Sequence, residues 1–362
     1  MRDIKTGIIG CGGIASGKHL PAIKALGNVS VVAFCDIIKE RAVKAAKTYG
    51  AKNARIYTDY KKMLEAEGSE METVHVLTPN SSHSEITVTA LESGRHVMCE
   101  KPMAKDVAGA EAMLAASKKT GKLLTIGYQS RYAPESEYLK KICEAGELGD
   151  IYYAEALALR RRAVPTWGVF LDADAQGGGP LIDIGTHALD LTLWLMDNYE
   201  PQMVTGSVYR KLADNENSAN AWGSWDPKEY TVEDSAFGFI RFKNGATIVL
   251  KSSWALNIVD CSEAKCILCG DIAGADMQDG LRINGEKFSQ TYITKPDLQK
   301  GGVAFYEGSK FSPSEKEAYT FYNAVINKGE LIVKPEQALM VTRILAAIYE
   351  SDKNGGKPIY FD

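Results

Sequence analysis

Two well-separated segments combine residue types that can perform acid–base chemistry. Glu100-Lys101-Pro102 ends a strand-like stretch and places a carboxylate and an ammonium after it. Residues 177–187 run from a glycine-rich loop into a stretch whose apolar residues have helical spacing. Asp183 and His187 are four residues apart, so one helical face presents both and the carboxylate can orient the imidazole. An isolated pair of this kind also occurs merely as a helix-stabilising contact, so its interpretation depends on the rest of the chain.

The N-terminus carries a dinucleotide-binding fingerprint. A strand leads into a Gly-x-Gly-x-x-Ala turn over residues 10–15, and a helix is predicted over residues 14–26. Gly10 permits the tight turn, and Gly12 lets the backbone approach a pyrophosphate at the helix N-terminus. The residues predicted to contact the cofactor here are Gly10, Gly12, Gly13 and Ile14.

A second strand, predicted over residues 29–35, ends in Asp36. An acidic side chain at this spacing accepts hydrogen bonds from the adenosine ribose hydroxyls. Its charge would repel a 2′-phosphate, so the sequence favours NAD over NADP. Lys39 and Arg41 keep the alternative open, because either could reach a phosphate, although solvation on a helix surface is their commoner role.

The length and net charge of the chain limit the classes of protein to which it can belong. The 362 residues suit a nucleotide domain over residues 1–128 and a substrate and oligomerisation domain over residues 129–362. A net charge of −4 provides no basic field for nucleic acid or an anionic membrane. No apolar stretch has the length of a membrane span and the N-terminus leads directly into a strand, so we predict a cytoplasmic protein with a small-molecule partner.

The cysteines favour a reduced compartment over a disulfide framework, because the seven are an odd number and scattered. Cys266 and Cys269 resemble half of a zinc ribbon, but no second pair follows. A strand there would also point the two thiols to opposite faces. With five histidines and no cluster of ligands, no metal site is predicted.

Strand-like and helix-like segments alternate up to about residue 128, which predicts an α/β, doubly wound parallel sheet. After the second strand, strands are predicted over residues 55–58, 73–78, 96–100 and 123–127, and helices over residues 39–49, 60–67, 83–93 and 107–120. Ligands of such sheets bind at the carboxyl ends of the strands. Those ends carry Gly10, Asp36, residues 78–80, residues 100–102 and Tyr128.

The rest of the chain predicts an α+β domain with a mainly antiparallel sheet. A helix is expected around residues 134–145, and strands over residues 151–161, 203–210, 236–242, 246–254 and 265–269. Asn244-Gly245 marks a tight hairpin, and residues 213–230 read as a long loop. An amphipathic helix over residues 335–350 is expected to pack back toward the nucleotide domain.

Together these features resemble the Gfo/Idh/MocA family, named for glucose-fructose oxidoreductase, inositol dehydrogenase and rhizopine catabolism. The resemblance spans most of the chain and implies a Rossmann-like N-terminal domain and an open-faced antiparallel C-terminal sheet that forms dimer or tetramer contacts. It also implies nicotinamide-dependent oxidation of a sugar or cyclitol hydroxyl, with C3 of the ring preferred. The motifs that carry it are the turn at residues 10–15, Asp36, Thr78-Pro79-Asn80 with His83, Glu100-Lys101-Pro102 and residues 179–187.

The resemblance also implies roles for individual residues. His187 would take the hydroxyl proton as general base, while Lys101 would bond the hydroxyl oxygen and stabilise the developing alkoxide. Asp183 would hold the substrate or tune His187. The role of Glu100 stays open between a ribose or nicotinamide contact and a packing partner of Lys101. On the nicotinamide side the resemblance places Thr78, Pro79, Asn80 and His83, although a simple helix-start role suits His83 nearly as well.

A further set of residues are candidate substrate contacts. The resemblance implies that Tyr128 and Arg131, which follow the last strand of the nucleotide domain, face the cleft and offer an aromatic wall and hydrogen-bond donors to a polyol. Strand alternation would put Arg160 and Arg162 on one face and Arg161 on the other. One set could then meet a carboxylate or phosphate while the other pairs with surface acids, although salt bridging is the commoner role for the group. Trp167 could stack on a pyranose or serve as a hydrophobic plug.

Two other functions remain open from the sequence. Some relatives retain NAD and use transient oxidation to cleave or epimerise a glycoside. A non-catalytic NAD-binding regulator is the third reading, since a binding fold does not guarantee chemistry.

Overall fold

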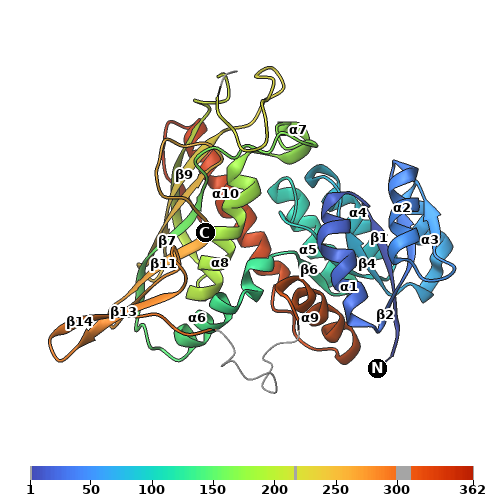
Figure 1. The fold of residues 1–362 in the computed structure, drawn as a ribbon, viewed down its shortest axis with the longest axis horizontal. Coiled ribbons are helices and arrows are strands. Elements are labelled where there is room, and N and C mark those ends of the chain that lie inside the picture. Colours follow the sequence, from blue (N-terminus) through green and yellow to red (C-terminus); the bar gives the residue numbers. More distant parts are fainter. Residues whose placement is uncertain (1, 216–217, 299–310, 362) are drawn as a thin grey trace. The chain divides into compact units, whose positions relative to one another are not determined.

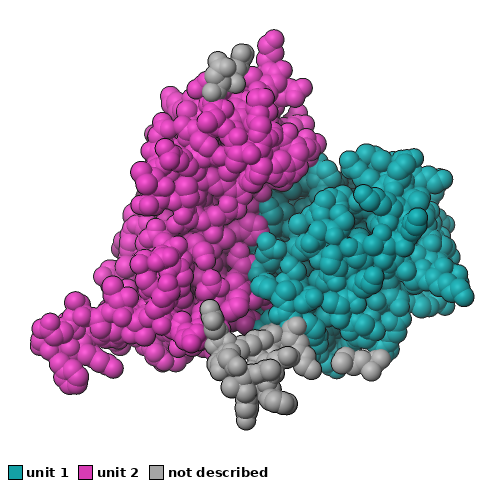
Figure 2. Space-filling model, in the orientation of Figure 1, with its two compact units in different colours: residues 1–129, 309–339 teal, residues 130–308, 340–362 magenta. Residues whose placement is uncertain are grey.

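The structure is a computed structural model that describes residues 2–215, 218–298 and 311–361. The chain forms two compact units, which Figure 2 colours separately. Unit 1 comprises residues 1–129 and 309–339, and unit 2 comprises residues 130–308 and 340–362. The predicted division at residue 128 lies one residue from the first of these boundaries, but residues 309–339 return to unit 1 rather than staying with the second domain.

Unit 1 contains a sheet whose strands are all parallel, in the order β3-β2-β1-β4-β5-β6 among the described residues. The order reverses direction at β1, which pairs with β2 on one side and β4 on the other. A crevice outside the carboxyl ends of strands at such a switch point is where doubly wound sheets bind ligands. The strands are β1 (Ile4–Ile9), β2 (Val29–Cys35), β3 (Arg55–Tyr57), β4 (Thr73–Val76), β5 (His96–Cys99) and β6 (Leu124–Ile126).

The helices between these strands largely follow the predicted pattern. Three of them have the predicted bounds: α2 (Lys39–Tyr49), α3 (Tyr60–Glu67) and α5 (Val107–Thr120). The first predicted helix is divided into a π-helical turn, η1 (Ala15–His19), and α1 (Leu20–Leu26), while α4 (Asn80–Glu92) begins three residues before the predicted start. A short 3-10 turn, η2 (Gly68–Glu70), follows α3.

Unit 1 is completed by a helix from near the end of the chain, α9 (Pro313–Asn327), which the sequence analysis missed. Phe321 and Tyr322 of α9 belong to the same buried apolar cluster as Ile8 of β1 and Leu20 of α1. Figure 1 shows α9 in dark red beside the blue α1. Buried contacts of this kind stabilise by about 25 cal/mol per Å² of apolar surface removed from water, so α9 is part of the core of unit 1.

Unit 2 is built on a sheet whose order among the described residues is β14-β13-β12-β11-β7-β10-β9-β8-β15. Its neighbours are antiparallel except for β7 and β10, which are parallel, so the predicted mainly antiparallel sheet is confirmed. The β13–β14 hairpin forms one edge, orange in Figure 1. The strands are β7 (Ile151–Leu159), β8 (Pro201–Tyr209), β9 (Ser235–Phe242), β10 (Thr247–Ser253), β11 (Ser262–Gly270), β12 (Gly274–Asp276), β13 (Arg282–Lys287), β14 (Gln290–Thr294) and β15 (Ile359–Tyr360).

The helices associated with unit 2 include the segment that carries Asp183 and His187. A π-helical turn, η4 (Leu181–Gly185), continues directly into α8 (Thr186–Met196), and α8 packs on β7 and β11. The division between the units crosses α10 after residue 339, and Glu336 near its start pairs with Lys118 of α5 in unit 1 at 3.3 Å. The remaining elements are η3 (Gln129–Tyr132), α6 (Pro134–Glu144), α7 (Ala173–Gln176) and α10 (Pro335–Lys353).

Candidate active site

The glycine turn after β1 has the backbone that a dinucleotide site requires. Gly10 has a φ of +94°, and a Cβ added there would lie 2.4 Å from the carbonyl oxygen of Leu77, so only glycine fits. A Cβ added at Gly12 would meet no atom within 4 Å. The space in front of this backbone is therefore open to a ligand. Gly13 and Ile14, also predicted as cofactor contacts, are exposed beside it.

Asp36 lies at the carboxyl end of β2 and is held by the backbone on two sides. Its Oδ2 accepts a hydrogen bond from the Cys11 N–H at 2.8 Å, and its Oδ1 accepts one from the Ile38 N–H at 2.8 Å. Each carboxylate oxygen can accept a further hydrogen bond, so ribose hydroxyls remain compatible with this geometry. The neighbouring Ile37 side chain is 88 % exposed, which leaves apolar surface beside Asp36 for a flat group such as adenine.

His83 connects the loops that follow β4 and β5. Its Nδ1 lies 2.8 Å from the Pro102 carbonyl oxygen and its Nε2 lies 2.9 Å from the Thr78 carbonyl oxygen. Burial lowers the pKa of His83, although both carbonyls favour the protonated ring. The ring is fully buried, so His83 fixes the Thr78 loop relative to the Lys101–Pro102 segment, whose peptide bond is cis. Of the remaining predicted cofactor residues in this loop, Pro79 is exposed and Asn80 is 9 % exposed.

Glu100, directly before Lys101, is the centre of a buried ionic cluster. Its Oε1 lies 2.7 Å from Lys18 Nζ and 2.7 Å from His19 Nε2, while its Oε2 accepts the Lys101 N–H at 3.1 Å. Lys18 also contacts Glu317 of α9 at 2.8 Å. Burial alone would raise the pKa of Glu100, but Lys18 and His19 outweigh it and hold that pKa well below its usual range. The Glu100 carboxylate therefore anchors the backbone that carries Lys101.

Two further groups extend this cluster into the core of unit 1. His19 Nδ1 lies 3.2 Å from His75 Nδ1, and His75 Nε2 lies 2.8 Å from the Tyr322 hydroxyl. Burial lowers the pKa of His75 well below its usual range, so the ring is neutral. A consistent arrangement has the Tyr322 hydroxyl donate to His75, His75 donate to His19, and His19 donate to Glu100. This chain of donors ends on the carboxylate that holds Lys101.

In unit 2, Asp183 and His187 are marked by their exposure. These two side chains are partly exposed, whereas all the remaining residues from 181 to 193 are buried. Asp183 lies in the π-helical turn η4, and its Oδ2 accepts a hydrogen bond from the Trp254 indole N–H at 3.0 Å. An otherwise buried helix thus offers a carboxylate and an imidazole to solvent, which suits general acid–base catalysis.

Glu233, which the sequence analysis missed, anchors the start of this helix. Its carboxylate accepts hydrogen bonds from the Gly179 N–H at 2.8 Å, the Leu181 N–H at 3.1 Å and the Tyr349 hydroxyl at 2.8 Å. These donors include N–H groups that a helix start leaves without intrahelical partners. Burial raises the pKa of Glu233, against the effect of these hydrogen bonds. No local motif announces this contact, because Glu233 is more than fifty residues away along the chain.

The structure places the predicted substrate contacts in different surroundings. Arg131 is fully buried and forms a two-bond ion pair with Asp190, at 2.9 and 2.6 Å, so we leave it out of the proposed site. Tyr128 in unit 1 is also fully buried.

The arginine cluster at residues 160–162 does not follow the predicted strand alternation, because β7 ends at Leu159. Arg160 instead bonds Glu263 with two nitrogens, at 2.6 and 2.7 Å, which matches the salt-bridge alternative. Arg162 bonds the side chain of Asn257. Trp167 is 51 % exposed and does not behave as a buried plug.

Among the described residues, no group of three or more His, Cys, Asp or Glu side chains is arranged to hold a metal ion. No helix within the described ranges has the length and apolarity to cross a membrane.

The sheet order of unit 1, its open glycine turn and the carboxylate after β2 define a Rossmann-type dinucleotide-binding unit. It is joined to a second unit in which Asp183 and His187 are partly exposed on a buried helix. Family models agree with this class: residues 4–128 match the oxidoreductase family with an NAD-binding Rossmann fold, and residues 140–360 match its C-terminal alpha/beta domain. The chain belongs to the Gfo/Idh/MocA family of oxidoreductases.

Comparison with individual proteins gives the same result. The chain is 35 % identical over 352 residues to a D-glucoside 3-dehydrogenase of Escherichia coli (strain K12), covering 97 % of this chain and 96 % of that protein. It is 30 % identical to a glucose-6-phosphate 3-dehydrogenase of Bacillus subtilis (strain 168), over 71 % and 69 % of the two chains. A levoglucosan dehydrogenase solved with NADH and L-sorbose shares the fold, with a TM-score of 0.85 at 20 % identity over 100 % of both chains. The protein is thus a member of a family of sugar and cyclitol oxidoreductases.

Proposed function

We propose that this protein is an NAD-dependent dehydrogenase that oxidises a secondary ring hydroxyl, at C3 of a glucoside or a related sugar. The observation that carries the proposal is the exposure of Asp183 and His187 alone on an otherwise buried helical segment. The similarity to D-glucoside 3-dehydrogenase over nearly the whole of both chains supports the substrate class and the reacting carbon.

The proposal assigns a role to each polar group of the candidate site. His187 accepts the proton of the substrate hydroxyl, and Asp183, oriented by Trp254, holds the substrate or tunes the imidazole. The Lys101 ammonium bonds the hydroxyl oxygen and favours its anionic form. Glu100 positions Lys101 through the backbone N–H rather than contacting the cofactor itself.

NAD would be held by the open turn at Gly10 and Gly12 and by Asp36, and when bound it supplies the acceptor for the hydride that leaves the sugar carbon. Thr78, Pro79 and Asn80 would border its nicotinamide end. The Asp36 carboxylate supports NAD over NADP because it would repel a 2′-phosphate.

Asp36→Ala should weaken binding of NAD about tenfold more than binding of NADP, and unchanged discrimination between the two cofactors would remove the basis for this preference.

The test of the activity is NADH formation when the protein and NAD are mixed with inositols, hexoses, sugar phosphates and glucosides, with NMR to locate the new carbonyl. Sustained NADH release with a glucoside and a carbonyl at C3 is expected.

His187→Asn should lower kcat by about 10² to 10⁴-fold, while Lys119→Met, in an exposed ion pair on α5, should leave kcat unchanged. A bound NADH signal that decays while the glycoside is cleaved or epimerised would replace the dehydrogenase with a redox-cycling enzyme. NAD binding with no reaction on any sugar would favour a regulator.

We also propose a homodimer or homotetramer assembled through the sheet of unit 2. Phe239 of β9, Val249 of β10 and Ile267 of β11 are not buried. The residues directly before and after each of them, whose side chains point to the other face of the sheet, are buried. One sheet face therefore keeps apolar side chains in partial contact with solvent, as an oligomer contact requires. Light scattering of the purified protein tests this directly, and a monomeric mass would contradict it.

A further inference from the structure

A pair of tryptophans is exposed on unit 2, outside the acid–base pair. Trp167 is 51 % exposed and Trp222 is 43 % exposed. Their ring centroids are 4.9 Å apart at an interplanar angle of 79°, so the two indoles form a corner. Large aromatic side chains that stay exposed together are typical of ligand-binding surfaces, because burying them would otherwise stabilise the fold.

The segments that carry these indoles are fixed to one another. The Asn220 side chain accepts a hydrogen bond from the Val164 N–H at 2.8 Å and donates one to the Val164 carbonyl at 3.0 Å. The Thr166 hydroxyl donates to the Trp222 carbonyl at 2.5 Å. The Arg160 guanidinium lies 5.2 Å from the Trp222 ring centroid and is itself held by Glu263. These contacts therefore hold the two indoles of the exposed corner in a fixed arrangement.

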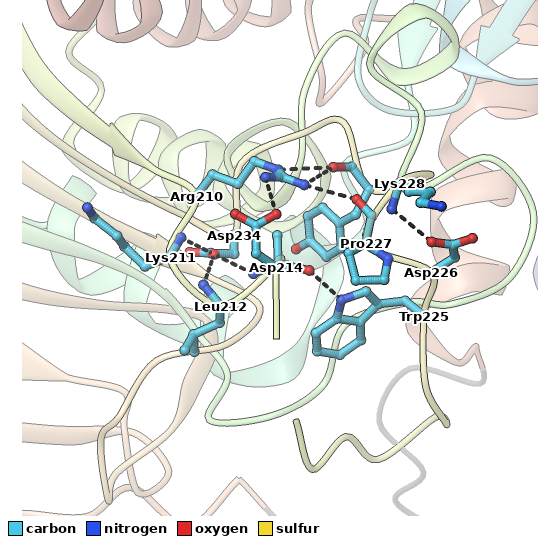
Figure 3. Close-up of polar contacts among 11 residues, drawn as sticks. Arg210, Lys211, Leu212, Asp214, Trp225, Asp226, Pro227, Lys228 and Asp234 are labelled. Carbon is cyan, nitrogen blue, oxygen red and sulfur yellow. Dashed lines mark hydrogen bonds and ion pairs between the residues drawn. The ribbon is translucent and has the colours of Figure 1, made fainter. Parts of the chain in front are cut away.

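The loop that contains Trp222 is also anchored where it leaves and rejoins the sheet, as Figure 3 shows. Asp234 accepts hydrogen bonds from the N–H groups of residues 211–213, at 2.6, 2.6 and 3.2 Å. Arg210 donates to the Tyr230 carbonyl at 2.7 Å, and the Trp225 indole donates to the Ala213 carbonyl at 2.7 Å. Residues that such hydrogen bonds already hold lose less conformational entropy when a ligand binds beside them.

A line of aromatic side chains joins this corner to Asp183. Trp167 contacts Phe170 with centroids 5.8 Å apart, and Phe170 contacts Trp254 with centroids 6.5 Å apart. The indole N–H of Trp254 donates to Asp183. The exposed pair thus lies two ring contacts beyond the indole that touches Asp183.

We propose that Trp167 and Trp222 form a second sugar subsite, which stacks on the ring linked to the ring that is oxidised. This inference rests on the proposed oxidation of a glucoside near Asp183 and His187. Pyranose rings have apolar C–H faces that pack on indoles, and the polar groups around the corner, such as the Arg160 guanidinium, suit the ring hydroxyls. The substrate class is therefore a two-ring glycoside, such as a glucose disaccharide or an aryl glucoside.

The test compares one-ring and two-ring substrates in Trp167→Ala and Trp222→Ala. Each variant should lose about five- to tenfold in kcat/KM for a β-linked glucose disaccharide and for phenyl glucoside, while kcat/KM for methyl glucoside changes less than about twofold. Tyr152→Ala, which removes a 59 % exposed aromatic ring on β7, is the matched control and should not separate the substrates. Equal losses for one-ring and two-ring substrates, or no loss for either, would overturn the subsite.

A binding measurement separates this inference from the proposed oxidation. Disaccharide titrations followed by tryptophan fluorescence should give a weaker Kd for Trp222→Ala than for Tyr152→Ala, whether or not turnover occurs. If the wild-type protein oxidises no sugar, the proposed function fails and the titration alone decides the subsite. If the tryptophan variants instead change the mass seen by light scattering and leave the substrate preference intact, the corner is a contact between copies of the chain and the subsite is rejected.

Discussion

The two units hold their proposed catalytic groups by different physical means. In unit 1, Lys101 follows a carboxylate that is fixed inside a buried cluster of charges, with Lys18 between Glu100 and Glu317. In unit 2, Asp183 is oriented by a neutral indole, and its helix starts on a single capping carboxylate. Charges buried in a core are stabilising only while all partners are present, whereas a neutral hydrogen bond can be lost at a modest cost. The support of Lys101 in unit 1 should therefore be more sensitive to the loss of one group than the support of Asp183 in unit 2.

The largest effect is expected for Lys18→Met. This change leaves Glu100 and Glu317 buried without their cation, so the free energy of unfolding should fall by about 3–5 kcal/mol. Urea unfolding measures it. Lys5→Met, which removes an exposed ion pair with Glu70, is the matched control and should leave the free energy of unfolding nearly unchanged. Equal effects of the two lysine changes would show that the buried cluster contributes no more to stability than an exposed ion pair.

The corresponding change in unit 2, Glu233→Gln, should cost less. The amide keeps one acceptor oxygen, so either the Gly179 or the Leu181 N–H loses its partner and the free energy of unfolding falls by about 1–3 kcal/mol. The same urea experiment measures the loss. A loss as large as that of Lys18→Met would show that the support of Asp183 depends on buried charge as strongly as the support of Lys101.

The two glutamates should also respond to pH with opposite sign. Lys18 and His19 lower the pKa of Glu100 below its ordinary 4.5 against the effect of burial, so its stabilising contribution is present above pH 4.5 and is lost as pH falls. Burial raises the pKa of Glu233, so its contribution is present below pH 4.5 and is lost as pH rises toward the raised pKa.

Unfolding of the wild-type protein, Glu100→Gln and Glu233→Gln across a pH series isolates these two contributions. The stability difference between wild type and each variant should change by up to about 1.4 kcal/mol per pH unit, with opposite slopes. Slopes of the same sign would contradict the contrast between the units.

The smallest effect is expected for Trp254→Phe. It removes the indole N–H that orients Asp183 and keeps most of the buried ring, so kcat should fall about fivefold, equivalent to about 1 kcal/mol. Trp225→Phe also removes an indole hydrogen bond, to Ala213, but away from Asp183, and should leave kcat for methyl glucoside unchanged. If both changes lowered kcat alike, the orientation of Asp183 by Trp254 would not be the cause.

Local patterns predicted much of the fold. Alternating apolar segments located β2, α2, α3 and α5 because each has a regular period and clear ends. The sequence also carried an unused signal for α9: Pro313 follows Ser312, and Ser312 and Glu315 form a capping box. That pattern sufficed to predict a helix, although not the unit it joins.

The contacts that anchor Lys101 and the start of the helix carrying Asp183 could not be predicted from local sequence patterns. Lys18 meets Glu100 from 82 residues away, and Tyr349 meets Glu233 from 116 residues away. Buried charged side chains look like surface residues in a sequence, because only the fold reveals the partner that compensates their desolvation. Asp183 and His187 could be proposed from the sequence because they are only four residues apart, whereas Trp254 and Glu233 are distant in the chain from the residues they contact.

The position of α9 has a consequence for how the protein can be made or rearranged. During synthesis the core of unit 1 stays incomplete until Phe321 and Tyr322 have emerged, long after β6. A fragment that stops at residue 128 would leave the apolar surface around Ile8 and Leu20 without this cover. A chimera that transplants the nucleotide unit of this chain therefore has to carry α9 with it, as a second, separate insertion.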